Sequence, residues 1–198
     1  FLFLREGIAP ADLAGAALVL AGTGLIAGKA RAKASLAAGA GRGYYSPMDT
    51  RKSTLYLLDS YGLVYRSYFA FISRPLTAPD GANVSAVFGF FRFLFSIFDR
   101  MNPEAFAAVF DSRVPTFRHE LYAEYKATRQ KTPEDLHAQV PLVEEGLRLL
   151  GVPILRTDGY EADDLIACLA ERCRAEGREC RIISADKDLL QLVGGPVK

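Results

Sequence analysis

The sequence has few cysteines, and they form no pattern that would hold a metal or a disulfide framework. Its three cysteines, Cys168, Cys173 and Cys180, include no C-x-x-C pair and are odd in number. This excludes a zinc ribbon or a disulfide-rich secreted domain and predicts reduced thiols in a cytoplasmic protein. A chain of 198 residues buries enough apolar surface to fold without such crosslinks.

The sequence also lacks a membrane-spanning segment in its first part. The apolar run Ala16–Ala27 is shorter than the roughly 20 residues that a bilayer crossing needs, so we expect no membrane partner. Residues 1–47 are rich in Ala, Gly and Leu, and the chain begins with Phe1. We expect residues 1–47 to be upstream sequence translated in frame, with Met48 as the start. A targeting segment or a dispensable extension are the alternatives.

An excess of positive charge is missing as well, since the formal net charge is +1. Nucleic-acid-binding domains are often basic overall. Any nucleic-acid binding by this chain must therefore come from the local arrangement of its charges.

From residue 54 onward, apolar runs of strand length alternate with longer amphipathic segments. Strands are predicted at 54–59, 105–111, 152–156 and 179–184. Helices are predicted at 84–101, 133–150 and 161–176 and from 186 to 193, with a loop over 73–83. Thr132 is expected as the N-cap and Pro133 as the first residue of the second helix. Helices between successive strands imply an α/β fold, a mostly parallel sheet with helices on both faces.

Carboxylates follow every predicted strand. Seven of them come from four segments, namely Asp59; Asp111; Glu161, Asp163 and Asp164; and Asp186 and Asp188. The carboxyl ends of parallel strands form the ligand edge of an open sheet. Crowded carboxylates raise one another's pKa unless cations neutralise them, and oxygen-only ligands suit Mg²⁺ or Mn²⁺. Each group alone could merely complement a helix dipole or form a turn. Their placement after all four strands predicts a metal site.

Several motifs around these carboxylates match a known family in order and spacing. They are Leu57-Leu-Asp59 with Tyr65-Arg66, Val109-Phe-Asp111, Pro115-Thr-Phe-Arg-His119, Tyr125-Lys126, Gly159-Tyr-Glu-Ala-Asp-Asp164 and Asp186-Lys-Asp-Leu-Leu-Gln-Leu192. Over residues 53–198 the chain resembles the 5′-nuclease (5′→3′ exonuclease) domain of bacterial DNA polymerase I, within the flap-endonuclease family. The resemblance implies a PIN- or resolvase-like fold, with residues 48–198 as the N-terminal part of the nuclease.

The resemblance also implies a role for each matching residue. A first metal would be held by Asp59, Asp111, Glu161, Asp163 and Asp164, with Asp186 shared or close by and Asp188 in a second metal cluster. Lys126 and Arg66 would act on the scissile phosphate. Residues 112–132 would form an arch over a DNA strand, and the implied DNA contacts are Tyr65, Phe117, Arg118, Tyr125 and Arg129. Basic and aromatic residues interleave in this segment, which suits a single strand, although a solvated loop explains the same composition.

The expected function is therefore phosphodiester hydrolysis by two divalent metals, Mg²⁺ or Mn²⁺, on DNA with 5′ ends or flaps. The setting would be replication and repair in the bacterial cytoplasm, near the nucleoid, with the protein as a monomer. In the family, further aspartates of the second metal cluster, a helix-hairpin-helix and the polymerase domain follow the point that corresponds to residue 198. We therefore expect a fold truncated before the helix-hairpin-helix and weak activity. The alternatives are a PIN-like ribonuclease or an inactive fragment that binds DNA 5′ ends.

Overall fold

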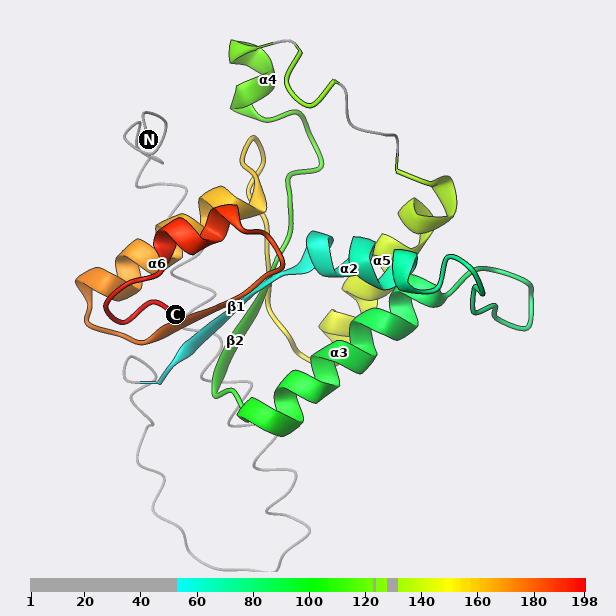
Figure 1. Ribbon diagram of the computed structural model, residues 1–198, viewed down its shortest axis with the longest axis horizontal. Coiled ribbons are helices and arrows are strands. Elements are labelled where there is room, and N and C mark those ends of the chain that lie inside the picture. The colour runs from blue at the N-terminus through cyan, green and yellow to red at the C-terminus, as the bar shows by residue number, and fades with distance from the viewer. Residues whose placement is uncertain (1–52, 123, 128–131) are drawn as a thin grey trace, which may run out of the picture.

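A parallel sheet runs through the centre of the computed structural model, which describes residues 53–122, 124–127 and 132–198 (Figure 1). Its four strands lie in the order β3-β2-β1-β4 and all pair in parallel. They are β1 (Leu55–Asp59), β2 (Ala105–Val109), β3 (Ile154–Leu155) and β4 (Cys180–Ile183). The predicted parallel sheet is confirmed, although β3 is shorter than the predicted strand over 152–156.

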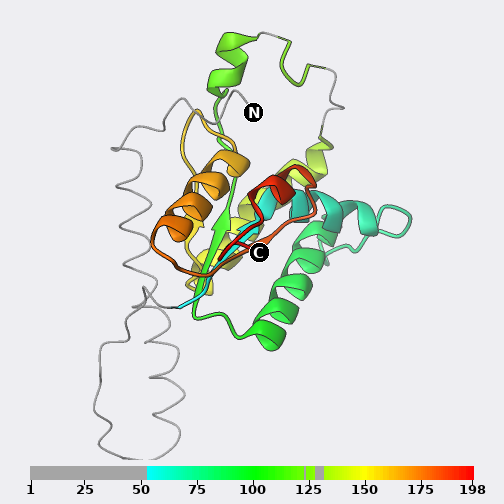
Figure 2. The same cartoon turned by 60° about the vertical axis from the view of Figure 1, so that its left-hand side comes forward.

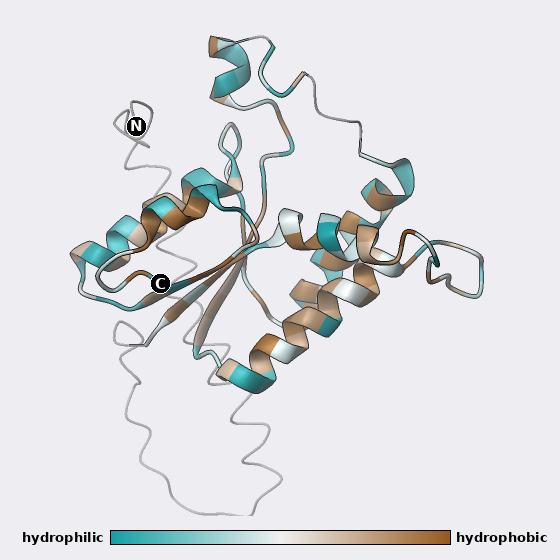
Figure 3. Cartoon of the chain, in the orientation of Figure 1, coloured by the Kyte–Doolittle hydropathy of each residue, from teal (hydrophilic) through white to brown (hydrophobic). Residues whose placement is uncertain are grey.

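Helices cover both faces of the sheet, as the alternation predicted (Figures 1 and 2). Because side chains along a strand point alternately to the two faces, Leu55 and Leu57 of β1 pack on one side. That side is covered by α6 (Ala162–Ala175) and the 3₁₀ helix η2 (Asp188–Leu192). Tyr56 and Leu58 face the other core, beneath α2 (Ser60–Ala70), α3 (Ser85–Met101) and α5 (Glu134–Leu149). Figure 3 shows the apolar colour concentrated along β1, β2 and much of α3.

Two glycines and one buried amide bring α2, α3 and α5 close together. A Cβ on Gly89 of α3 would lie 2.7 Å from Ser67 Cβ of α2, and a Cβ on Gly146 of α5 would overlap the ring of Phe91. The fully buried Gln139 of α5 accepts a hydrogen bond from the Ala86 backbone N–H at 2.8 Å. This bond satisfies a free N–H in the first turn of α3, which has no side-chain cap of its own.

Helix α2 was not predicted from the sequence. Its buried positions include Ser60 and Ser67, whereas the large aromatic side chains of Tyr65 and Phe69 are exposed. Because polar residues are buried and aromatic residues are exposed, the helix lacks the regular spacing of apolar residues that identifies a surface helix in a sequence. The helix is stabilised instead by its N-cap, Asp59, which accepts a hydrogen bond from the Gly62 N–H at 3.4 Å.

Two predicted helix starts were wrong. Helix α5 begins at Glu134 with Pro133 as its N-cap, and the Thr132 hydroxyl lies 3.4 Å from the Tyr61 hydroxyl instead of capping. The extended ψ of 140° at Pro133 places that residue outside the helix. The predicted helix over 186–193 is the shorter η2, because Asp186 Oδ1 accepts a hydrogen bond from the Asp188 N–H at 2.8 Å and forms a turn.

The segment expected to form an arch contains a short helix, α4 (Phe117–Leu121). In both views α4 stands apart from the other helices, beyond the carboxyl ends of the strands (Figures 1 and 2). The expectations for residues 1–47, Met48 and Arg129 fall outside the described residues and stay predictions. Within the described ranges, none of the helices combines the length and apolar character needed to cross a membrane.

Candidate metal centre

Asp59 lies at the carboxyl end of the central strand β1 and caps α2. Its Oδ2 accepts a hydrogen bond from Ser184 Oγ at 2.7 Å. Burial raises the pKa of Asp59, the hydrogen bonds from Ser184 and Gly62 oppose this, and the charges of Asp111 and Asp186 raise it further. The net direction is upward, so burial and the neighbouring carboxylates disfavour the charged form of Asp59.

Asp111 follows β2 and is tied to the start of α6. Its Oδ1 accepts a hydrogen bond from the Ala162 N–H at 2.8 Å, which places the carboxylate at the positive end of the helix dipole. Its main-chain carbonyl accepts a hydrogen bond from Arg156 Nε at 2.8 Å. The two bonds hold both the backbone and the side chain of Asp111 at the sheet edge.

Asp163, in the first turn of α6, has the strongest shift among these carboxylates. Burial is the largest cause, followed by the charges of Asp59, Asp186, Asp111 and Glu161, and together they raise the pKa of Asp163 to about 6. Five carboxylates from four segments of the chain therefore lie close enough to act on one another. The predicted convergence on one edge of the sheet is present in the structure.

Glu161 and Asp164 differ from these residues because the predicted arch segment supplies them with cations. Arg118 donates to both oxygens of Asp164 at 2.7 Å. Lys126 Nζ lies 2.5 Å from Glu161 Oε1, and the Tyr125 hydroxyl donates to Glu161 Oε2 at 3.1 Å. The bidentate pair with Asp164 raises the pKa of Arg118. Arg118, Tyr125 and Lys126 of the predicted arch segment therefore contact the acids at the start of α6, at the edge of the sheet.

Asp188 completes the set on the far side of α6. A cavity of about 260 Å³ is lined by Asp163, Asp164 and Glu161 of the α6 start, by Asp188 at the start of η2, and by Arg118 and Tyr125. Asp186 is linked to Asp59 through Ser184, whose Oγ accepts a hydrogen bond from the Asp186 N–H at 2.9 Å and donates one to Asp59 Oδ2. The structure therefore brings all seven predicted carboxylates to the same edge.

In the ranges that the structure describes, no three Asp, Glu, His or Cys side chains form a ready-made metal cluster. The hydrogen bonds explain this, because Asp164 and Glu161 point at arch cations and Asp59 points at Ser184. The available donors are nevertheless all carboxylate oxygens, and those around Asp163 repel one another. Such a donor set fits a hard divalent cation, which takes oxygen ligands and removes the repulsion.

The remaining predicted contact residues occupy different surroundings. Arg66 of α2 lines a groove that also contains Asp59. Tyr65 is exposed and packs against Phe69, with ring centroids 4.5 Å apart.

Phe117 of α4 packs near Tyr160, with ring centroids 5.7 Å apart, and the Arg118 guanidinium lies 4.6 Å from the centre of the Phe117 ring. The ring of Phe117 is therefore partly covered in this conformation, and its predicted role in base stacking stays a prediction.

A buried ion-pair network behind Asp111 was not found from the sequence. Glu144 of α5 is 1% exposed, and its carboxylate contacts Arg113 at 2.5 Å, Arg156 at 2.6 Å and Arg148 at 3.1 Å. Burial raises the pKa of Glu144, but the hydrogen bond from Arg156 and the charges of the three arginines outweigh it, so the pKa is lowered. Because Arg156 also binds the Asp111 carbonyl, the network holds the backbone of Asp111 at the carboxylate edge.

Ser184 was missed as well, although the pattern Ser184-Ala-Asp186 carries a usable signal. A serine two residues before an aspartate commonly accepts the aspartate N–H in a turn, as the Ser184 hydroxyl does here. The network around Glu144 has no such local signal, since its members come from three separate segments.

Comparison with known proteins agrees with this geometry. The chain belongs to the family described as 5′-3′ exonuclease, N-terminal resolvase-like domain, which matches residues 54–198. DNA polymerase I of Treponema pallidum is 60% identical over 142 residues, which cover 72% of this chain and 14% of that protein. The 5′-3′ exonuclease of Aquifex aeolicus is 46% identical over 140 residues, which cover 71% of this chain and 48% of that protein. The chain thus spans less than half the length of these two relatives.

Solved structures show that the fold is shared. The D15 protein of bacteriophage T5, co-crystallized with metal ions, superposes with a TM-score of 0.53 at 21% identity, over 73% of this chain and 52% of that one. The same T5 protein, described as a flap endonuclease in a complex with DNA and metal ions, gives a TM-score of 0.51 at 18% identity, over 73% of this chain and 53% of that one. The predicted resolvase-like fold is therefore confirmed.

Proposed function

We propose that this chain is the front part of a 5′-nuclease that hydrolyses phosphodiester bonds of DNA at or near 5′ ends with the help of divalent metal ions. The observation that carries the proposal is the group of mutually repelling carboxylates around Asp163 at the carboxyl edge of the sheet. Support comes from the family, from the relatives named DNA polymerase I and 5′-3′ exonuclease, and from the T5 protein's complex with DNA and metal ions.

The carboxylates divide into two proposed metal positions. Asp59, Asp111, Glu161, Asp163 and Asp164 would hold the first, while Asp186 and Asp188 would contribute to a second. Divalent metals supply Lewis-acid stabilisation of phosphoryl charge when they are bound. The donors suit Mg²⁺ and Mn²⁺ equally, so we expect both to support activity.

Arg118 and Lys126 would exchange partners during the reaction cycle. In this structure they neutralise Asp164 and Glu161. Metal ions at the same carboxylates would take over that neutralisation and leave the two cations free for phosphate oxygens. Lys126 also has a φ of 60°, a region that residues other than glycine rarely adopt. Its release from Glu161 would let its ammonium group stabilise charge that develops on the phosphate.

The test is cleavage of a DNA substrate with a labelled 5′ flap, in Mg²⁺ or in Mn²⁺. We expect residues 1–198 to cut slowly and a protein extended by a downstream half, like that of the Aquifex relative, to cut faster. Asp111→Asn in the extended protein should abolish cleavage, and Asp158→Asn, at an exposed loop aspartate, should not.

The same assay separates the competing functions. Preferred cleavage of single-stranded RNA over the DNA flap would indicate a PIN-like ribonuclease. Binding of 5′-ended DNA by the extended protein without any product would indicate a DNA-binding protein and would contradict the proposed nuclease.

A further inference from the structure

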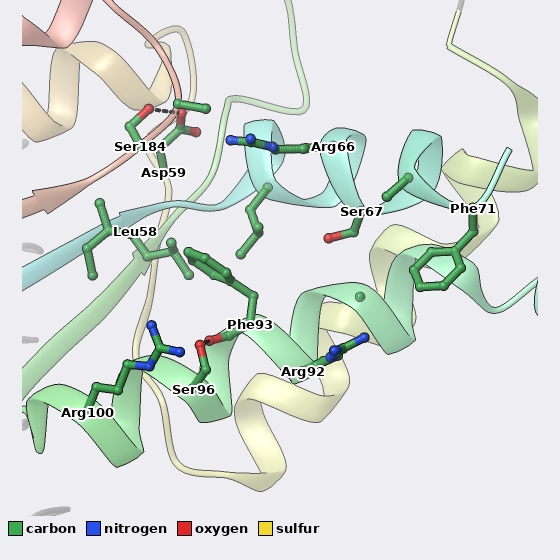
Figure 4. Close-up of a pocket in the computed structure, with 15 residues that line it drawn as sticks. Leu58, Asp59, Arg66, Ser67, Phe71, Arg92, Phe93, Ser96, Arg100 and Ser184 are labelled. Atoms are coloured by element: carbon green, nitrogen blue, oxygen red, sulfur yellow. Dashed lines mark hydrogen bonds between the residues drawn. The ribbon is translucent and has the colours of Figure 1, made fainter.

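A groove of about 610 Å³ lies between α2 and α3 and reaches the carboxylate edge (Figure 4). Asp59 and Ser184 line one end of it, and Phe71 of the segment after α2 lines another part of its wall. At Gly89 and Ser67 the two helices approach so closely that a Cβ on Gly89 would lie 2.7 Å from Ser67 Cβ. The groove is therefore narrow at this point, and it reaches the candidate metal centre at Asp59.

Three arginines line this groove and give it a positive charge. Arg66 comes from α2, and Arg92 and Arg100 come from α3; Figure 4 shows Arg66 directed toward Asp59 and Ser184. Within the described part of the chain, none of the three has an ion pair or a side-chain hydrogen bond. Among the residues that line the groove, Asp59 is the one carboxylate. Unpaired guanidinium groups in a row are suited to a polyanion.

The groove also offers aromatic surface beside the arginines. The Phe93 side chain is 42% exposed and stands between Arg92 and Arg100, close to the end that contains Leu58 (Figure 4). Ser67 of α2 and Ser96 of α3 also line the groove. Aromatic faces next to a row of cations form the combination by which proteins bind single-stranded nucleic acid without sequence preference.

The spacing along α3 suits contacts with separate phosphates. Arg92 and Arg100 are eight residues apart, which corresponds to about 12 Å along a helix with a rise of 1.5 Å per residue. We therefore expect the two arginine side chains, when each extends away from the helix, to contact different phosphates of one strand. A strand that follows the groove would meet Arg66 first, near Asp59, and then the two arginines of α3.

We propose that this groove binds a single DNA strand that leaves the carboxylate edge, with Arg92 and Arg100 on its phosphates and Phe93 against a base. The proposal rests on the proposed nuclease function, because the strand is the one whose phosphate lies at that edge. A groove with a narrow point and a stacking platform favours a single strand over a duplex, whose bases are already stacked on one another.

The test measures binding of a fluorescent single-stranded oligodeoxynucleotide by anisotropy over a series of salt concentrations. Protein 1–198 carries Asp111→Asn throughout and is kept in Mg²⁺, so that the strand is not cut. Each phosphate contact with a single strand contributes about 0.7 to the slope of log K against log salt concentration. Arg92→Gln and Arg100→Gln should each lower the slope by about 0.7, and the double variant by about 1.4. The matched control is Arg172→Gln on α6, which removes the same charge from an exposed position on the opposite face.

Phe93→Leu tests the stacking contact separately. It should weaken binding on the order of tenfold while leaving the salt slope unchanged, because it removes no charge. Arg92, Phe93 and Arg100 are exposed, so melting temperatures should match that of the parent protein and exclude unfolding as the cause.

Slopes for Arg92→Gln and Arg100→Gln equal to that of Arg172→Gln would overturn the groove proposal. So would an equal loss of affinity for a blunt duplex of the same length, because that result would indicate a diffuse basic surface. The nuclease proposal is tested independently. If cleavage depends on Asp111 but the salt slopes of the arginine variants are unchanged, only the groove proposal is contradicted. If the slopes are lowered but the extended protein does not cleave, the groove is a nucleic-acid site and the nuclease proposal is contradicted.

Discussion

Two buried or partly buried carboxylates of this protein occupy opposite environments. Glu144, beneath the segment that follows β2, is surrounded by Arg113, Arg148 and Arg156, and its pKa is lowered. Asp163, at the start of α6, is surrounded by other carboxylates, and its pKa is raised to about 6. The same chemical group is thus stabilised as an anion at one position and destabilised at the other.

The difference separates a structural role from a functional one. A carboxylate whose charge is neutralised by surrounding arginines, such as Glu144, is not available to bind a cation. A carboxylate that lies among other carboxylates, such as Asp163, can lower its free energy by binding a proton or a cation. We therefore expect Glu144 to contribute to stability and Asp163 to metal binding.

Removal of Glu144 should produce the largest change in stability. Glu144→Ala leaves three arginines without their shared partner, and loss of one partner from a buried ion pair costs about 3–5 kcal/mol. Because Arg113 and Arg148 are largely exposed, we expect the low end, about 3 kcal/mol, in urea unfolding. The adjacent Glu145→Ala is the matched control, since Glu145 is 59% exposed and pairs with Arg148 alone. It should cost less than about 1 kcal/mol. Equal losses for both variants would show that the network around Glu144 contributes no more than a surface ion pair.

Asp163→Asn should have the opposite effect on the metal-free protein, because it removes one of several repelling charges. The variant should melt at a higher temperature than the parent without metal. Mn²⁺ at a hundredfold excess over its Kd should stabilise the parent by about 2.7 kcal/mol and Asp163→Asn by much less. Asp158→Asn, at an exposed loop position, serves as the control. A Mn²⁺ effect that is the same in all three proteins would contradict the assignment of Asp163 as a ligand.

Gly62→Ala should separate stability from metal affinity. Alanine normally stabilises a helix interior by about 1 kcal/mol relative to glycine. Here its Cβ would lie 2.9 Å from Asp59 Oδ2, so the carboxylate must move. Because the displaced Asp59 would also lose its capping bond to the helix, we expect a melting temperature that changes little. The Mn²⁺ affinity, measured by calorimetry, should fall on the order of tenfold.

Ser184→Ala should weaken Mn²⁺ binding in the same direction as Gly62→Ala, since it removes the hydroxyl that orients Asp59. Ser96→Ala, which removes a hydroxyl bound only to the Phe93 carbonyl, should not. If neither Gly62→Ala nor Ser184→Ala changes the affinity, Asp59 is not a ligand.

The pH dependence of unfolding should show the smallest effect. Glu144 has a pKa below its ordinary value of 4.5, so its contribution to stability is present above that value and is lost as the pH falls through the lower folded-state pKa. Glu144→Gln should reduce the loss of stability that the parent protein shows as the pH falls below the ordinary glutamate value of 4.5. Unfolding free energies from urea titrations at several pH values would show it, and parallel curves for the two proteins would contradict it.

The parts that could be predicted from sequence were those with a local signal. Apolar runs that end in Asp59 and Asp111 placed the strands and the carboxylates together, because parallel strands end at one edge of a sheet. The acids at the start of α6 were visible for the same reason.

The parts that could not be predicted depend on contacts between distant segments. Helix α2 buries two of its serines, Glu144 contacts arginines from three segments, and α3 approaches α2 closely at Gly89. No periodicity within a single segment contains that information. The Arg118 and Lys126 pairs were also unforeseen, since both residues were assigned to DNA and not to the acids that they contact.

If the carboxylates bind a metal and the arch segment binds DNA, as proposed, those two ion pairs would link the metal affinity to the DNA affinity. As long as Lys126 and Arg118 contact Glu161 and Asp164, a divalent ion would compete with cations that belong to the protein itself. A DNA strand that draws these side chains to its phosphates would remove the competitor and so raise the affinity for the metal. By thermodynamic reciprocity, the metal would raise the affinity for the strand by the same factor. The free protein would then hold its ions weakly, and the intact site would assemble only around its substrate.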